Sequence, residues 1–114
     1  MSRTLVHGQL SYLQIPAQDA ARSGSFYATV FQWQVDGAGF DAAGTFGQFV
    51  TERPPAPEAG PFLWLHVEDV DRVLEHARAE GAVVLSPPVP DGPTRRLATF
   101  RDPGGNTIGI VSHR

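Results

Sequence analysis

The side chains that could do acid–base or metal chemistry in this sequence are mainly its four histidines, because it contains no cysteine. His66 ends the run FLWLH (62–66), where an imidazole could act as a general base near neutral pH. No nucleophile or partner carboxylate stands at a recognisable spacing from it. We therefore expect no catalytic residue other than His66 as a candidate base, and a hydrogen-bonded structural histidine is the alternative interpretation.

The other three histidines give weaker evidence for a catalytic or metal site. His76 falls on the exposed face of an expected helix, and His7 and His113 lie near the chain ends. A metal site rebuilt from His66 with His7 or Glu52 stays open as an alternative, although we identify no groups in the sequence that would support such ligands. The sequence also lacks the GxSxG, phosphate-loop and HExxH motifs. We therefore expect no metal site.

Alternating residues of the expected strands place aromatic and amide side chains on one face. Every second side chain of a strand points the same way. Residues 62–66 therefore turn Phe62, Trp64 and His66 to one side, and residues 10–14 turn Tyr12 and Gln14 to that side as well. Apolar walls with a few polar groups are typical of a small-molecule pocket. The alternative is that the aromatic side chains fill a closed core or lie beneath a dimer partner.

Gly109 stands inside the expected last strand (Thr107–His113), shortly after the tight turn Asp-Pro-Gly-Gly-Asn at 102–106. Glycine weakens the interior of a strand, so its presence indicates a bulge, a close approach of another group, or the loss of a functional side chain. The alternation places Gly109 on the cavity side. It is therefore a candidate ligand-binding residue that leaves room at the cavity floor.

The elements that must position these residues repeat along the chain. Residues 10–19 (LSYLQIPAQD) align with residues 60–69 (GPFLWLHVED), and each segment ends in an aspartate placed to cap a helix. The predicted helices are Ala20–Phe31 and Val70 to about Glu80. Three strands are expected after each helix, at 33–36, 39–42 and 45–52 in the first half and at 83–85, 95–101 and 107–113 in the second.

This pattern predicts an α+β protein built from two βαβββ modules. A single domain (1–114) would contain a first module at about 8–52, a linker at 53–61 (RPPAPEAGP) and a second module at about 62–113. One such module cannot bury both its helix and its sheet alone, so the two should pack together. Aligning the module ends (GQFVTE with IGIVSH) makes Gln48 the counterpart of Gly109.

Composition excludes several classes of protein. The net charge is −3, all positive side chains are arginine, and only Arg95-Arg96 forms a local cluster, so nucleic acid is not an expected partner. No stretch approaches the roughly 20 apolar residues of a membrane span, and the segment MSRTLVHGQL has no apolar signal-peptide core. Without cysteine there is no disulfide framework, and a cytoplasmic location is expected.

Three segments together resemble the vicinal oxygen chelate superfamily, which includes glyoxalase I, bleomycin-resistance proteins and extradiol dioxygenases. They are SYLQIPAQDAARSGSFYATVFQW, FLWLHVEDVDRVLEHARAEGA and GPTRRLATFRDPGGNTIGIV. The resemblance implies paired βαβββ modules with sheets curled into a concave cleft, helices on the outer faces, and often a homodimer. Open sheet edges also favour a homodimer.

The resemblance also implies where metal-binding members carry their ligands, on the first and last strands of each module. Those positions are Tyr12, Gln48, Phe62 and Gly109 in this sequence. Phe62 and Gly109 cannot coordinate a cation, Gln48 is a weak oxygen donor, and Tyr12 would have to ionise. We therefore interpret the family's metal site as dismantled and expect no cofactor, with a divalent metal as the alternative.

These observations predict a metal-free protein that holds a hydrophobic or aromatic small molecule, in the manner of the bleomycin-resistance branch. The ligand-binding candidates are Tyr12, Gln14, Gln48, Phe62, Trp64, His66 and Gly109. One alternative is a glyoxalase- or dioxygenase-like enzyme with a relocated metal site. The other is a dimeric interaction module whose cleft is plugged by its own aromatic side chains.

Overall fold

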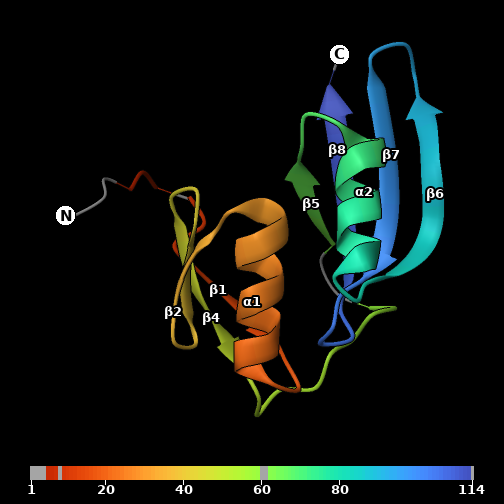
Figure 1. Cartoon of the computed structure of the whole chain (residues 1–114). Coiled ribbons are helices and arrows are strands. Elements are labelled where there is room, and N and C mark those ends of the chain that lie inside the picture. The colour runs from red at the N-terminus through yellow and green to blue at the C-terminus, as the bar shows by residue number, and fades with distance from the viewer. Residues whose placement is uncertain (1–4, 8, 60–61, 114) are drawn as a thin grey trace.

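Two sheets and two helices make up the fold (Figure 1). A computed structural model describes residues 5–7, 9–59 and 62–113, so part of the predicted linker (53–61) and the predicted start of the first module at residue 8 lie outside the described residues. The elements, in chain order, are β1 (Tyr12–Pro16), α1 (Ala20–Phe31), β2 (Gln34–Asp36), β3 (Gly39–Ala42), β4 (Thr45–Val50), β5 (Leu63–His66), α2 (Val70–Ala79), β6 (Val83–Asp91), β7 (Arg95–Arg101) and β8 (Thr107–His113).

The two sheets have the same topology. Their strand orders are β1-β4-β3-β2 and β5-β8-β7-β6, and in each the first strand pairs in parallel with the last while the other pairs are antiparallel. Neither sheet closes into a barrel, because each keeps two edge strands. The predicted α+β class with two βαβββ modules is confirmed.

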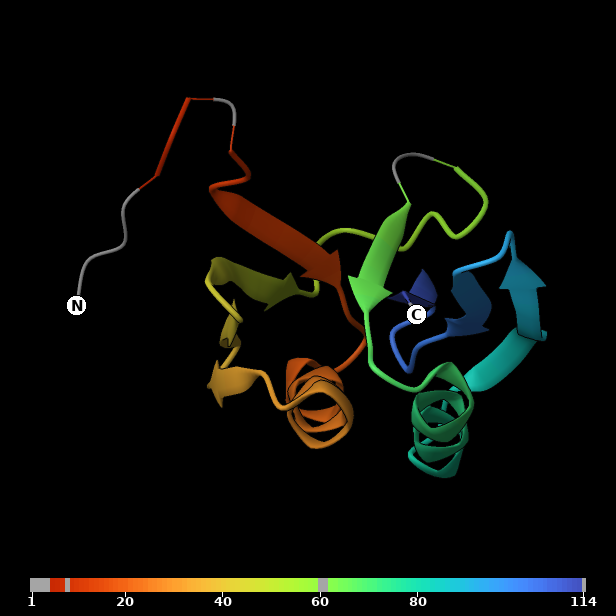
Figure 2. The ribbon, with the colours of Figure 1, turned by 90° about the horizontal axis from the view of Figure 1, so that it is seen from above.

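The helices begin where the sequence predicts. Asp19 accepts hydrogen bonds from the backbone N–H groups of Ala21 and Arg22, and Asp69 accepts one from Arg72. The two helices lie side by side on the same side of the sheets, so the opposite faces of both sheets carry no helix (Figure 2). In the part of the chain that is described, neither helix has the length and apolar character to cross a membrane.

Strand β6 is longer than predicted. The strand expected at 83–85 ends before Pro87, Pro88 and Pro90, and proline cannot donate a hydrogen bond to a sheet. The structure instead continues the strand to Asp91. It can do so because β6 is an edge strand, and two register shifts interrupt its pairing with β7.

Helix α1 joins the two modules through aromatic packing. The ring centroids of Phe26 and Phe31 lie 5.9 and 6.3 Å from the ring centroid of Phe100 on β7. Both phenylalanines belong to the helix of the first module. Phe26 is only 1% exposed. The buried face of α1 is broad because the helix packs against strands of both sheets.

The Asp-Pro-Gly-Gly-Asn turn ties the second module to the first. The buried carboxylate of Asp102 accepts hydrogen bonds from the Tyr27 hydroxyl (2.7 Å) and from the backbone N–H groups of Gly104 and Asn106. The Asn106 amide donates to the carbonyl of Pro16 at the end of β1 (2.7 Å). A Cβ on Gly104 would lie 2.7 Å from that same carbonyl oxygen, so only glycine allows this approach.

Tyr27 remains a hydrogen-bond donor in this network. Its side chain is fully buried, and burial together with the neighbouring Asp102 carboxylate raises the pKa of the phenol well above its usual value. The phenol therefore keeps its proton and satisfies a carboxylate that would otherwise be buried with one fewer partner.

Replacing Tyr27 by phenylalanine should lower the free energy of unfolding by about 1–3 kcal/mol, because it leaves a buried acceptor short of a donor. Urea denaturation measures this loss. Ser25→Ala is the matched control, since it removes an exposed hydroxyl from the same helix and should cost less than about 0.5 kcal/mol. Equal losses in the two variants would contradict the structural role of the Tyr27–Asp102 bond.

Candidate functional site

The helix-free face of the first sheet carries three of the candidate residues. The register of β1 with β4 pairs Tyr12 with Phe46 and Gln14 with Gln48, so all four side chains share this face. The Tyr12 hydroxyl donates a hydrogen bond to Oε1 of Gln48 (2.7 Å). Tyr12 is still 52% exposed, so this pair stands at the surface of a single chain.

The helix-free face of the second sheet carries an aromatic pair. Phe62 and Trp64 are stacked with ring centroids 5.0 Å apart and planes inclined by 27°. They are 45% and 46% exposed, which is unusual for two neighbouring large aromatic side chains of a single chain. This Phe62–Trp64 pair forms a flat apolar surface open to solvent.

Gly109 lies directly beneath the indole of Trp64. A Cβ on Gly109 would stand 2.6 Å from Cζ3 and 2.7 Å from Cδ2 of that ring, closer than side-chain atoms approach one another. The pairing of β7 with β8 runs without interruption through Gly109, which is opposite Thr99. The bulge interpretation of Gly109 is therefore wrong, and the space it leaves is taken by Trp64.

His66 finds its partner at the chain end. Its Nδ1 lies 3.4 Å from Nδ1 of His113, and the two rings are stacked with centroids 5.5 Å apart. No local pattern in the sequence pairs His113 with another group. The signal that could have found this contact is the parallel pairing of the first and last strands of the module, in which His66 is opposite Val111, two residues before His113 on the same face.

The residues at the family's metal positions do not fit a cation. Phe62 and Gly109 offer no side-chain donor atom, and the two remaining side chains, Tyr12 and Gln48, are bonded to each other. Across residues 5–7, 9–59 and 62–113, no three histidine, aspartate or glutamate side chains gather closely enough to hold a metal ion. These four positions therefore lack the donor atoms that a bound cation would need.

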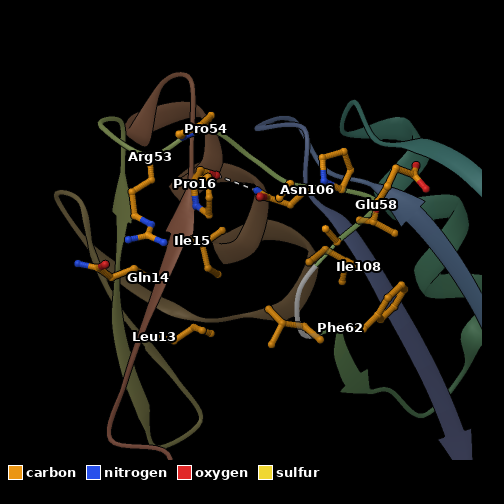
Figure 3. Close-up of a pocket in the computed structure, with 15 residues that line it drawn as sticks. Leu13, Gln14, Ile15, Pro16, Arg53, Pro54, Glu58, Phe62, Asn106 and Ile108 are labelled. Atoms are coloured by element: carbon orange, nitrogen blue, oxygen red, sulfur yellow. Dashed lines mark hydrogen bonds between the residues drawn. The ribbon is translucent and has the colours of Figure 1, made fainter.

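Two cavities divide the other candidate residues between them. The first, of about 550 Å³, lies between β1 and the start of β8 and includes Gln14 and Phe62 (Figure 3). The second, of about 580 Å³, lies between β5 and the end of α1 with the β2–β3 hairpin, and it includes Trp64 and His66. Both volumes suit a small organic ligand.

Within one chain the seven candidate residues are therefore not gathered in a single pocket. Tyr12, Gln48 and Gly109 line neither of these two cavities. Phe62 lines the first cavity and Trp64 lines the second, so the stacked pair lies at the boundary of the two cavities.

Comparison with known proteins gives the same superfamily that the sequence motifs resemble. A model of the Glyoxalase/Bleomycin resistance protein/Dioxygenase superfamily matches residues 9–110. A glyoxylase-like domain-containing protein of Didymella fabae is 28% identical over 123 aligned residues, covering 95% of this chain and 96% of that protein.

Solved structures share the fold. A glyoxalase/bleomycin resistance protein/dioxygenase family enzyme of Burkholderia phytofirmans PsJN has a TM-score of 0.79 at 21% identity, covering 94% of this chain and 100% of that one. The fosfomycin resistance protein FosX of Listeria monocytogenes has a TM-score of 0.80 at 15% identity, covering 96% of each chain. TioX of Micromonospora sp. ML1 has a TM-score of 0.69 at 20% identity, covering 94% and 100%.

Gly109→Ala should displace the Trp64 indole and lower the free energy of unfolding by about 1–3 kcal/mol, the usual cost of overpacking. In a Trp64→Ala background the same substitution meets no ring, so its cost should vanish or change sign. Denaturation of the four proteins of this double-mutant cycle measures both values. An equal cost in both backgrounds would show that Trp64 does not depend on Gly109.

Proposed function

The chain belongs to the glyoxalase/bleomycin resistance protein/dioxygenase superfamily, and on that basis we propose that it binds a hydrophobic or aromatic small molecule on the Phe62–Trp64 pair. The binding needs no cation at Tyr12, Gln48, Phe62 or Gly109. The observation that carries this proposal is the pair itself, two stacked rings that are nearly half exposed at the boundary of two cavities.

The physical basis of binding is the removal of apolar surface from water. A planar ligand that covers the exposed side of the Phe62–Trp64 pair gains hydrophobic free energy and offset stacking with the rings. Gly109 fixes the indole against the sheet, so little side-chain entropy is lost on binding. The aromatic surface is therefore preorganised for ligand binding.

Polar groups can orient the ligand. The bond from Tyr12 uses Oε1 of Gln48 as its acceptor, which leaves the amide N–H groups of Gln48 to donate to a ligand carbonyl. Gln14 lies opposite Gln48 in the sheet and lines the first cavity. These groups suit an uncharged aromatic molecule that carries one or two acceptor atoms.

We propose further that the protein is a homodimer in which the Tyr12–Gln48 face of one copy covers the Phe62–Trp64 pair of the other. A single chain leaves the two faces apart and exposes many large apolar side chains on its strands. Covering these side chains would bury apolar surface and bring the divided candidate residues into one cleft.

Ligand binding is tested by isothermal titration calorimetry of the protein and its variants, in EDTA, with a panel of naphthol and indole derivatives, and tryptophan emission of the wild-type protein is a second readout. Saturable quenching is expected, and Trp64→Ala should weaken binding at least about tenfold, since stacking on one ring contributes roughly 1–3 kcal/mol. Val83→Ala, an exposed apolar residue on the far edge strand of the same sheet, should leave the affinity unchanged. A panel that never perturbs the emission, or equal losses in both variants, would contradict the proposal.

Light scattering coupled to size-exclusion chromatography tests the dimer. The wild-type protein should run at about twice the 12.3 kDa mass of one chain. Phe46→Glu places a charge on the helix-free face of the first sheet and should yield monomers with unchanged circular dichroism, because an unpaired charge is costly to bury. A wild-type protein that is monomeric at high micromolar concentration would overturn this arrangement.

A further inference from the structure

His66 and His113 are the two imidazoles that the proposed ligand-binding role does not require. They stand at the ends of β5 and β8, and parallel pairing of these strands holds them on the same helix-free face. Both side chains are exposed to solvent, and their Nδ1 atoms face each other across 3.4 Å. We propose that they form a two-imidazole binding site for a divalent transition-metal cation such as Cu²⁺, Ni²⁺ or Zn²⁺.

The separation of the two nitrogens suits chelation. Protein hydrogen bonds from N–H groups usually span roughly 2.7–3.2 Å, so 3.4 Å is long for a hydrogen bond between the rings. A tetrahedral ion with metal–nitrogen bonds of about 2.0–2.1 Å holds two ligand nitrogens about 3.3–3.4 Å apart. The pair therefore already has the spacing that such an ion demands.

The site does not coincide with the family's metal positions. His66 follows Phe62 by four residues and His113 follows Gly109 by four, so the pair is displaced by about 13 Å along both strands. An ion bound there would stand beside Trp64, which precedes His66 by two residues on the same face. It would also stand near the second cavity, which His66 lines together with Trp64.

The charged side chains near His66 and His113 do not prevent a cation from binding. Arg95 lies opposite His113 on β7, where its guanidinium would repel a metal ion. That guanidinium is paired with the carboxylate of Asp91 at 3.0 Å, which offsets the repulsion. Two neutral nitrogen donors then select the ion: imidazole favours Cu²⁺, Ni²⁺ and Zn²⁺, whereas Mg²⁺ and Ca²⁺ prefer oxygen ligands. Water or a donor atom of a bound molecule completes the coordination.

The test uses tag-free, chelator-treated and desalted protein, titrated by calorimetry with CuCl₂, ZnCl₂ and MgCl₂. One Cu²⁺ or Zn²⁺ per chain should bind, and Mg²⁺ should not. His66→Gln and His113→Gln should each weaken binding at least about tenfold, since even supporting groups of metal ligands matter that much. His76→Gln removes a histidine from α2 and is the matched control, with no change expected.

Trp64 supplies a second readout because it precedes His66 by two residues on the same face. Bound Cu²⁺ should quench its emission, and Trp64→Phe should remove that part of the quenching while the calorimetric affinity stays the same. A double variant of His66 and His113 that binds Cu²⁺ as tightly as the wild type would overturn the site. So would an equal loss in His76→Gln. The aromatic titration is performed in EDTA, so failure of one proposal leaves the other distinguishable.

Discussion

The helix-free face of the second sheet depends on the missing side chain of Gly109. Because no Cβ stands there, the Trp64 indole can lie against β8, and Phe62 can stack on the indole. Any other residue at this position would push the ring away from the sheet and break the flat apolar surface. The family resemblance implies a metal ligand at position 109, and in this chain the glycine at that position supports an aromatic surface instead.

A second constraint fixes how the modules meet. Asp102 joins Tyr27 of the first module to the turn of the second, and Asn106 reaches the carbonyl of Pro16. The Asp-Pro-Gly-Gly-Asn turn is among the residues that carry the family resemblance, and its contacts here are structural. The turn can therefore be kept for structural reasons, whatever residues stand at Tyr12, Gln48, Phe62 and Gly109, where the resemblance implies metal ligands.

Local patterns in the sequence were sufficient for the helices, their aspartate caps and most strands, because capping and side-chain alternation act over a few residues. Contacts between residues far apart in the sequence were harder to predict. Strand β6 extends beyond the predicted 83–85 to Asp91, and it tolerates its prolines because it lies at the sheet edge. The contact of Trp64 with Gly109 and that of His66 with His113 both require the parallel register of β5 with β8, which no local pattern encodes. Alternation placed the candidate residues on the correct faces, but it could not show that one chain divides them between two cavities.

The most direct test of the account is a nuclear magnetic resonance titration of isotope-labelled protein with a naphthol derivative in the presence of EDTA. We predict that the indole N–H of Trp64 and the backbone amide of Gly109 show the largest shifts, that both saturate together, and that no divalent ion is needed. Shifts that appear only after a metal ion is added, or that gather elsewhere and leave Trp64 unchanged, would contradict direct binding to the aromatic pair.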